Sequence, residues 1–187
     1  MNNVDESADK KTLSLAPKHN MPNANLVMMN CSDFSFLVSS DEIASLCPVQ
    51  QVVMQPLSVH DCGYVEFEQR VYPVFCFNKA LQLQTSLKEP HTAVVLFNHR
   101  NHYFGVTCVD VEKISDSSSQ NAMANLTFYE VPICMRSRKQ PFTEFAVINN
   151  RAAGLTSASA LFTLLRLRGA KLAAQQELSN KVLQGAG

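Results

Sequence analysis

The side chains best suited to chemistry are six cysteines and five histidines. Thiolates and imidazoles act as nucleophiles, bases and metal ligands, but each role requires partners at suitable positions. His60 and Cys62 stand two residues apart, and a thiol hydrolase using this pair is one interpretation of the sequence. Because Cys–His catalysis depends on arrangement in space rather than on adjacency, the pair is weak support for an enzyme. We expect no catalytic residues and expect the cysteines to be free, buried thiols, since no two have C-x-x-C spacing.

His99 and His102 flank a short polar stretch between two β-rich segments. A metal site there would need further ligands, for which Asp110 or Glu112 are candidates. Histidines in a hairpin turn more often point into solvent, and we expect that arrangement and no metal.

Two other charged patterns suggest surfaces rather than reactive centres. Glu66 and Glu68 lie two residues apart in a predicted strand, so both carboxylates would face the same side and protect it against aggregation. Basic residues cluster at 136–139 and 166–171 without interleaved aromatic side chains that would stack on bases, so we expect no nucleic-acid binding. No glycine-rich loop is present to hold a phosphate, and we expect no cofactor.

Composition and charge are those of an ordinary globular protein. The 16 Lys and Arg balance the 16 Asp and Glu, and hydrophobic residues make up 46% of the chain. No segment has the roughly 18 consecutive apolar residues that a membrane span requires. The polar N-terminus lacks the apolar segment of a secretory signal, so we expect a cytoplasmic protein with a disordered leader over residues 1–23.

Most of the remaining chain predicts short strands. Residues 64–77 begin with alternating polar and apolar side chains and end in an apolar run, which predicts one strand with Pro73 at an edge or bulge. Residues 92–98 and 103–111 predict a hairpin with a loop of about four residues. From Ser157 the leucine spacing predicts a helix that ends or is interrupted near Gly169. The chain is therefore expected to be mostly β, with a C-terminal helix.

Four segments, in this order, resemble the CheW family of coupling domains. They are the apolar run at 49–56, the segment GYVEFEQRVYPVFCF at 63–77, the segment TAVVLFNHRNHYFGVTCVDV at 92–111, and the ending FAVINNRAAGLTSASALFTLL at 145–165. The matching positions are Gly63, Pro73, Val74, Phe77, Gly105 and Val111. Each motif is weak alone, whereas their order and spacing are moderately specific.

The resemblance implies two small SH3-like five-stranded β-barrels packed together, with a groove between them and a C-terminal helix. This domain would span residues 24–166, followed by a helical tail over 167–187. The family is non-catalytic and acts as an adaptor that couples chemoreceptors to a CheA-type histidine kinase. It therefore implies a cytoplasmic scaffold at membrane-associated receptor arrays, without membrane insertion, in chemotaxis or in type IV pilus twitching motility.

The sequence departs from the family pattern where partners are contacted. Glu66, Glu68 and Gln69 stand where the family usually has Asn, Arg and Gly, so an acidic residue replaces the basic residue implicated in receptor contact. Such a reversal changes the charge complementarity that selects partners. We expect a divergent coupling protein whose partner surface comprises Glu66, Glu68, Arg70, Tyr72 and Val74. A small-barrel module that binds an unrelated protein by strand addition is the main alternative.

Overall fold

The computed structural model describes residues 17–22, 25–32, 34–87, 90–114, 125–133, 136 and 140–170. It contains thirteen strands, two short 3-10 helices and one α-helix within these ranges. In chain order they are β1 (Pro17–Pro22), β2 (Leu26–Asn30), β3 (Ser35–Ser39), η1 (Ser40–Glu42), β4 (Ile43–Pro48), η2 (Val49–Gln51), β5 (Gly63–Phe67), β6 (Arg70–Phe77), β7 (Leu83–Gln84), β8 (Ala93–His99), β9 (His102–Cys108), β10 (Asp110–Ile114), β11 (Asn125–Glu130), β12 (Glu144–Ile148), β13 (Arg151–Leu155) and α1 (Ala158–Leu167).

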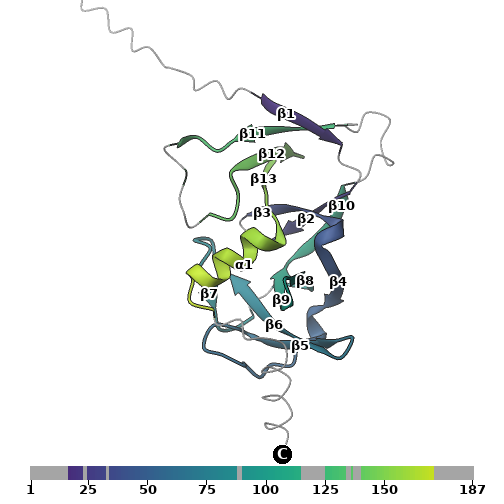
Figure 1. The fold of residues 1–187 in the computed structure, drawn as a ribbon, viewed down its shortest axis with the longest axis vertical. Coiled ribbons are helices and arrows are strands. Elements are labelled where there is room, and N and C mark those ends of the chain that lie inside the picture. The colour runs from purple at the N-terminus through teal and green to yellow at the C-terminus, as the bar shows by residue number, and fades with distance from the viewer. Residues whose placement is uncertain are drawn as a thin grey trace, which may run out of the picture.

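The strands form two curled sheets with α1 packed between them (Figure 1). One sheet has the order β1-β11-β12-β13-β3-β2-β10, and the other has the order β4-β8-β9-β6-β5 with β7 added to β6. The mostly β fold of two packed, barrel-like units with a C-terminal helix is thus confirmed. The number of strands differs from the five expected in each unit: the first sheet has seven strands, and the second has six when β7 is counted.

The three largest hydrophobic cores explain why the central strands are apolar throughout. One core fills the seven-stranded sheet, and another fills the six-stranded sheet. The third lies between the sheets and takes side chains from both of them and from α1. Along β2, Leu26 and Met28 face the first core while Val27 and Met29 face the shared core. Strands buried on both faces read as continuous apolar runs rather than as alternating ones.

Residues 63–77 form a hairpin, not the single strand expected. β5 and β6 pair antiparallel, and Glu68 and Gln69 form the turn with φ values of 49° and 61°. Positive φ at both central residues matches the twist of a two-residue hairpin. Pro73 lies in β6, opposite Tyr64 of β5. β6 is an interior strand rather than the edge strand expected, and its pairing with β9 begins one residue after Pro73, at Val74.

The other hairpin expected from the sequence is present. Strands β8 and β9 pair antiparallel, with Arg100 and Asn101 in positive-φ conformations between them, so the loop has two residues rather than about four. A third turn of this kind, at Asn149 and Asn150, joins β12 to β13.

Part of the expected leader is a strand. β1 pairs antiparallel with β11 and forms the edge of the seven-stranded sheet. The prediction of disorder relied on scarce apolar side chains, but strand addition at an edge is stabilised by main-chain hydrogen bonds and tolerates proline. Residues 1–16 lie outside the described part of the chain.

The closing helix ends where the sequence predicts. Ser157 caps α1 by accepting a hydrogen bond from the Ala160 N–H at 3.1 Å, and Gly169 follows the helix with φ of +88°. Leu161, Leu164 and Leu165 enter the shared core. The expected tail beyond residue 170 lies outside the described residues.

Candidate partner-binding surfaces

The tip of the β5–β6 hairpin presents charge on a rigid base. Glu66, Glu68 and Arg70 are all exposed. The guanidinium carbon of Arg70 lies 4.9 Å from the centre of the Tyr103 ring, which is a cation–π distance. The Tyr103 ring packs edge-on against Tyr72 at 5.3 Å between centroids, and Tyr72 packs against Phe67 at 6.3 Å. Arg70 is therefore held by an aromatic cluster anchored in the core.

Two of the five residues expected at the partner surface are interior. Tyr72 is 1% exposed and Val74 is 0% exposed, and both belong to the core of the six-stranded sheet. Burial raises the pKa of the Tyr72 hydroxyl, although the nearby Arg70 opposes this shift. Neither side chain is accessible to a partner, and both pack in the core that includes Tyr103, on whose ring Arg70 lies.

The hairpin turn is strained relative to the other two of its kind. Asn is among the residues that adopt positive φ most readily, and Asn occupies one or both central positions in the turns at 100–101 and 149–150. Glu68 and Gln69 have no such preference, and this conformation costs roughly 1–2 kcal/mol per ordinary residue. Strain of this size at an exposed, charged tip is typical of functional positions.

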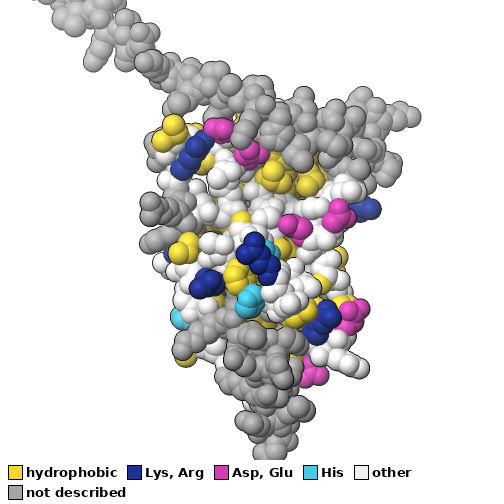
Figure 2. Space-filling view, in the orientation of Figure 1, with side chains coloured by type: hydrophobic (Ala, Val, Ile, Leu, Met, Phe, Trp, Pro, Cys, Tyr) yellow, Lys and Arg dark blue, Asp and Glu magenta, His cyan; other side chains and the backbone are white. Residues whose placement is uncertain are grey.

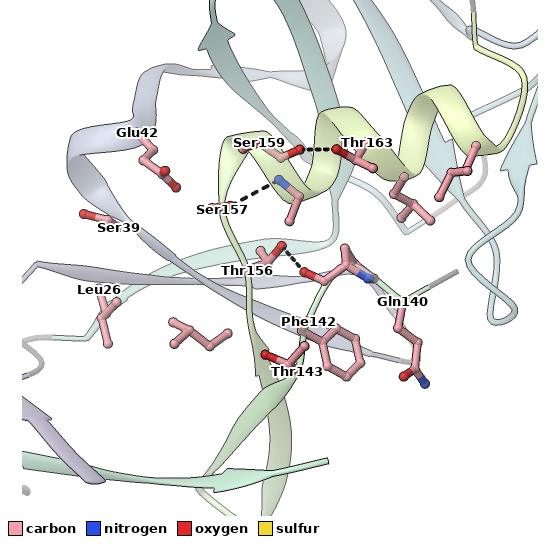
Figure 3. A pocket seen from close by; sticks show the side chains of 15 residues that line it. Leu26, Ser39, Glu42, Gln140, Phe142, Thr143, Thr156, Ser157, Ser159 and Thr163 are labelled. Atoms are coloured by element: carbon pink, nitrogen blue, oxygen red, sulfur yellow. Dashed lines mark hydrogen bonds between the residues drawn. The ribbon is translucent and has the colours of Figure 1, made fainter. Parts of the chain in front are cut away.

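A groove of about 640 Å³ lies beside α1, between the helix and segment 140–143 (Figure 3). Its apolar lining includes Leu26, Phe142 and Leu164. The groove is fixed by hydrogen bonds at its rim: Glu42 accepts from the Ala158 N–H at 3.0 Å, and Thr156 donates to the carbonyl of Pro141 at 2.9 Å. These bonds connect η1, α1 and the loop before β12, so the groove is preformed.

On the face that carries α1, basic, histidine and hydrophobic side chains lie close together (Figure 2). Phe162 of α1 packs against His99 at 5.3 Å and against His102 at 4.8 Å between ring centroids. The guanidinium carbon of Arg166 lies 6.0 Å from the centre of the same Phe162 ring. The two histidines thus hold α1 to the β8–β9 turn and are half-buried, rather than solvent-exposed as expected. Burial, together with Arg100 and His102, lowers the pKa of His99.

The pair proposed for a thiol hydrolase is not assembled. The Cys62 thiol donates to the carbonyl of Gln84 at 3.1 Å, while the His60 ring lies next to Gly169. Another cysteine has a histidine partner: the Cys76 sulfur lies 3.7 Å from Nδ1 of His91. Sequence reasoning missed this pair because its members are 15 residues apart: Cys76 is in β6 and His91 lies just before β8, and they meet beside Thr107 of β9.

Comparison with known proteins identifies the family of the chain through a family model. No curated protein matches the chain. Among solved structures, the chain is similar to the scaffolding protein TtCheW from Thermoanaerobacter tengcongensis, with 11% identity, a TM-score of 0.48, and coverage of 72% of this chain and 88% of that chain. At 10 residues α1 is too short to cross a bilayer, and no other helix in the described ranges is long and apolar enough.

The family model of the CheW-like domain matches residues 25–151, which is more than half of the chain. The chain therefore belongs to the CheW-like domain family, whose members are scaffolds and adaptors of chemotaxis signalling.

Proposed function

We propose that the chain couples a chemoreceptor to a CheA-type histidine kinase, and that the tip of the β5–β6 hairpin is one of its docking surfaces. The observation that carries the surface assignment is that Glu66, Glu68 and Arg70 are exposed at or near one turn, with Arg70 packed on an aromatic cluster. Family membership supports an adaptor role without catalysis.

The charge at the tip indicates the chemistry of the partner. Two carboxylates and one guanidinium, on the turn and on the strand ends beside it, suit a partner that offers basic side chains to the glutamates and an acidic group to Arg70. Rim charges of this kind act mainly on the association rate and on partner choice, so salt should weaken the contact.

The test is binding of the full chain to a receptor cytoplasmic tip fragment and, separately, to the kinase regulatory domain. We expect Glu68→Arg to change the association rate for one of these two ligands by about tenfold or more at low salt. Arg70→Ala should weaken the same contact without unfolding the protein, since it removes a cation–π contact worth only about 0.5–1 kcal/mol at an exposed site.

Asp41→Arg is the matched control, because it makes the same charge reversal at an exposed position on η1. Equal effects of Glu68→Arg and Asp41→Arg would mean that net charge alone matters and would remove the hairpin from the proposal. Absence of binding to both ligands by the folded wild-type chain would reject the coupling function and favour an unrelated protein-binding module.

We further propose that the protein acts in the cytoplasm at receptor arrays, in chemotaxis or in type IV pilus twitching. A strain that lacks the chain should lose directed swimming in the first setting and twitching in the second. Normal behaviour in both assays would exclude both settings.

A further inference from the structure

Two cysteines and one histidine that the coupling function does not use meet beside β7. Cys62 precedes β5, Cys76 lies near the end of β6, and each is 1% exposed. Both thiols contact Gln84: Cys62 donates to its backbone carbonyl at 3.1 Å, and Cys76 donates to its side-chain oxygen at 3.9 Å. The two thiols are also close enough for each to change the pKa of the other. They therefore form a neighbouring dithiol rather than two isolated core residues.

The surroundings distinguish the two sulfurs. Nδ1 of His91 lies 3.7 Å from the Cys76 sulfur and 2.8 Å from the Thr107 hydroxyl, while Nε2 lies 3.3 Å from the Ser32 hydroxyl. Cys62 first, and then His91 and Thr107, lower the pKa of Cys76 against the opposing effect of burial. The neighbouring Cys76 and then burial raise the pKa of Cys62. Such a pair has one reactive sulfur and one resolving sulfur.

We propose that Cys62 and Cys76 form a peroxide-sensitive dithiol in which Cys76 is oxidised first and Cys62 resolves it to an intramolecular disulfide. A proton passes from Cys76 to His91, and the Cys76 thiolate attacks hydrogen peroxide. The S–O bond forms, the O–O bond breaks, and the departing hydroxide takes a proton to become water. The Cys62 thiol then loses its proton and attacks the sulfenic acid, so that the S–S bond forms and a second water leaves. Two thiols and one peroxide give one disulfide and two waters.

Access to the dithiol is controlled by a weakly held element. β7 has only two residues, and it pairs with β6 at Cys76 and Phe77. Short elements of this kind open locally at low free-energy cost. A disulfide would remove the hydrogen bonds from both thiols to Gln84, so oxidation should loosen β7. Thiols in a reducing compartment that form such bonds act as transient sensors rather than as structural crosslinks.

Disulfide mapping in the full chain tests the proposal directly. The protein is treated with hydrogen peroxide, alkylated, and digested with trypsin and an endoproteinase that cleaves before aspartate. This digestion separates the cysteines: Cys62 falls in peptide 61–70, Cys76 in 71–79, Cys47 in 41–60 and Cys108 in 101–109. We expect peptides 61–70 and 71–79 to become linked about tenfold faster than peptides 41–60 and 101–109 lose their free thiols. Equal rates for all four, or a different linkage, would overturn the proposal.

Variants separate the roles of the two sulfurs. Cys62→Ser keeps a hydrogen-bond donor but no resolving sulfur, so Cys76 should accumulate as a sulfenic acid that dimedone traps. Cys76→Ser should leave Cys62 unreactive. His91→Asn should slow the oxidation of Cys76 about tenfold and move its pH profile upward, because a lost stabilising contact of one pKa unit changes the thiolate fraction tenfold. Trapping at Cys62 in place of Cys76, or an unchanged pH profile in His91→Asn, would reject these roles, and circular dichroism confirms that each variant is folded.

Discussion

The two glycines that carry the family resemblance, Gly63 and Gly105, are required for different physical reasons. A Cβ on Gly63 would lie 2.2 Å from the carbonyl oxygen of Val53, and Gly63 has φ of +146°. Val53 forms reciprocal main-chain hydrogen bonds with Tyr64, which brings the two backbones together. A Cβ on Gly105 would instead meet a methyl group of Val94 at 2.8 Å, and φ there is not in the positive range.

Gly63→Ala should therefore destabilise the protein more than Gly105→Ala. A valine side chain can shift, so overpacking at Gly105 should cost about 1–3 kcal/mol. At Gly63 the neighbour is backbone and the conformation is unfavourable for alanine, which adds about 1–3 kcal/mol. Urea denaturation of the two variants measures the difference. A smaller cost at Gly63 than at Gly105 would contradict the close approach of Val53.

At the scale of elements, we expect that relieving the strain in the β5–β6 turn stabilises the protein. Replacing Glu68 and Gln69 by Asn and Gly supplies the residues that tolerate positive φ, and should stabilise the protein by about 1–2 kcal/mol. Thermal unfolding measures the gain. The same change should weaken partner binding, since it removes the exposed Glu68 carboxylate. A more stable variant with unaltered binding would show that the turn is not part of the docking surface.

The same turn explains why the site could be only partly predicted. Without Asn or Gly at 68–69, the sequence reads as one alternating strand, which places Glu66, Tyr72 and Val74 on one face. The two-residue turn changes which side chains share a face of the sheet: Glu66 pairs with Val71, and Tyr72 pairs with Val65 on the opposite face. Tyr72 and Val74 therefore face the core. The charged residues at the tip are exposed in either arrangement, because they lie at the end of the hairpin.

The helix α1 should dock in a pH-dependent manner. His99 packs against Phe162, and the charged or titratable groups around it are Arg100, His102, Glu42 and Arg166. Because the pKa of His99 is lowered in the folded state, the unfolded chain takes up its proton first as pH falls. Stability contributed by neutral His99 is thus present above the unfolded pKa of about 6.5 and is lost as pH falls through that value toward the folded pKa.

His99→Gln should flatten this dependence. Denaturation midpoints measured between pH 7.5 and 5 should fall less steeply for the variant than for the wild type. Arg100→Gln is the informative companion, since it removes a charge that lowers the pKa of His99 and should reduce the slope in part. Identical slopes in all three proteins would assign the pH dependence to other groups.

At the scale of the whole molecule, the sequence predicts the class of fold better than its connections. Apolar runs such as residues 94–97 indicate strands buried on both faces, and this is what a sheet between two cores requires. The pairing of β13 with β3, and of β10 with β2, joins segments far apart in the chain. Nothing in local spacing encodes these contacts, which is also why the meeting of Cys76 with His91 was not foreseen.

The shared core should make the two sheets unfold together. Leu161 of α1 is fully buried among side chains from both sheets, whereas Leu126 is buried within the seven-stranded sheet alone. Leucine-to-alanine changes at such sites cost about 2–5 kcal/mol. We expect Leu161→Ala to lower hydrogen-exchange protection in β3 and β8 equally, because each contributes to the core that the helix covers. Leu126→Ala should first affect β11, which contains Leu126, and the neighbouring strand β12. If Leu161→Ala left one of the two sheets fully protected, the units would be independently stable and α1 would belong to only one of them.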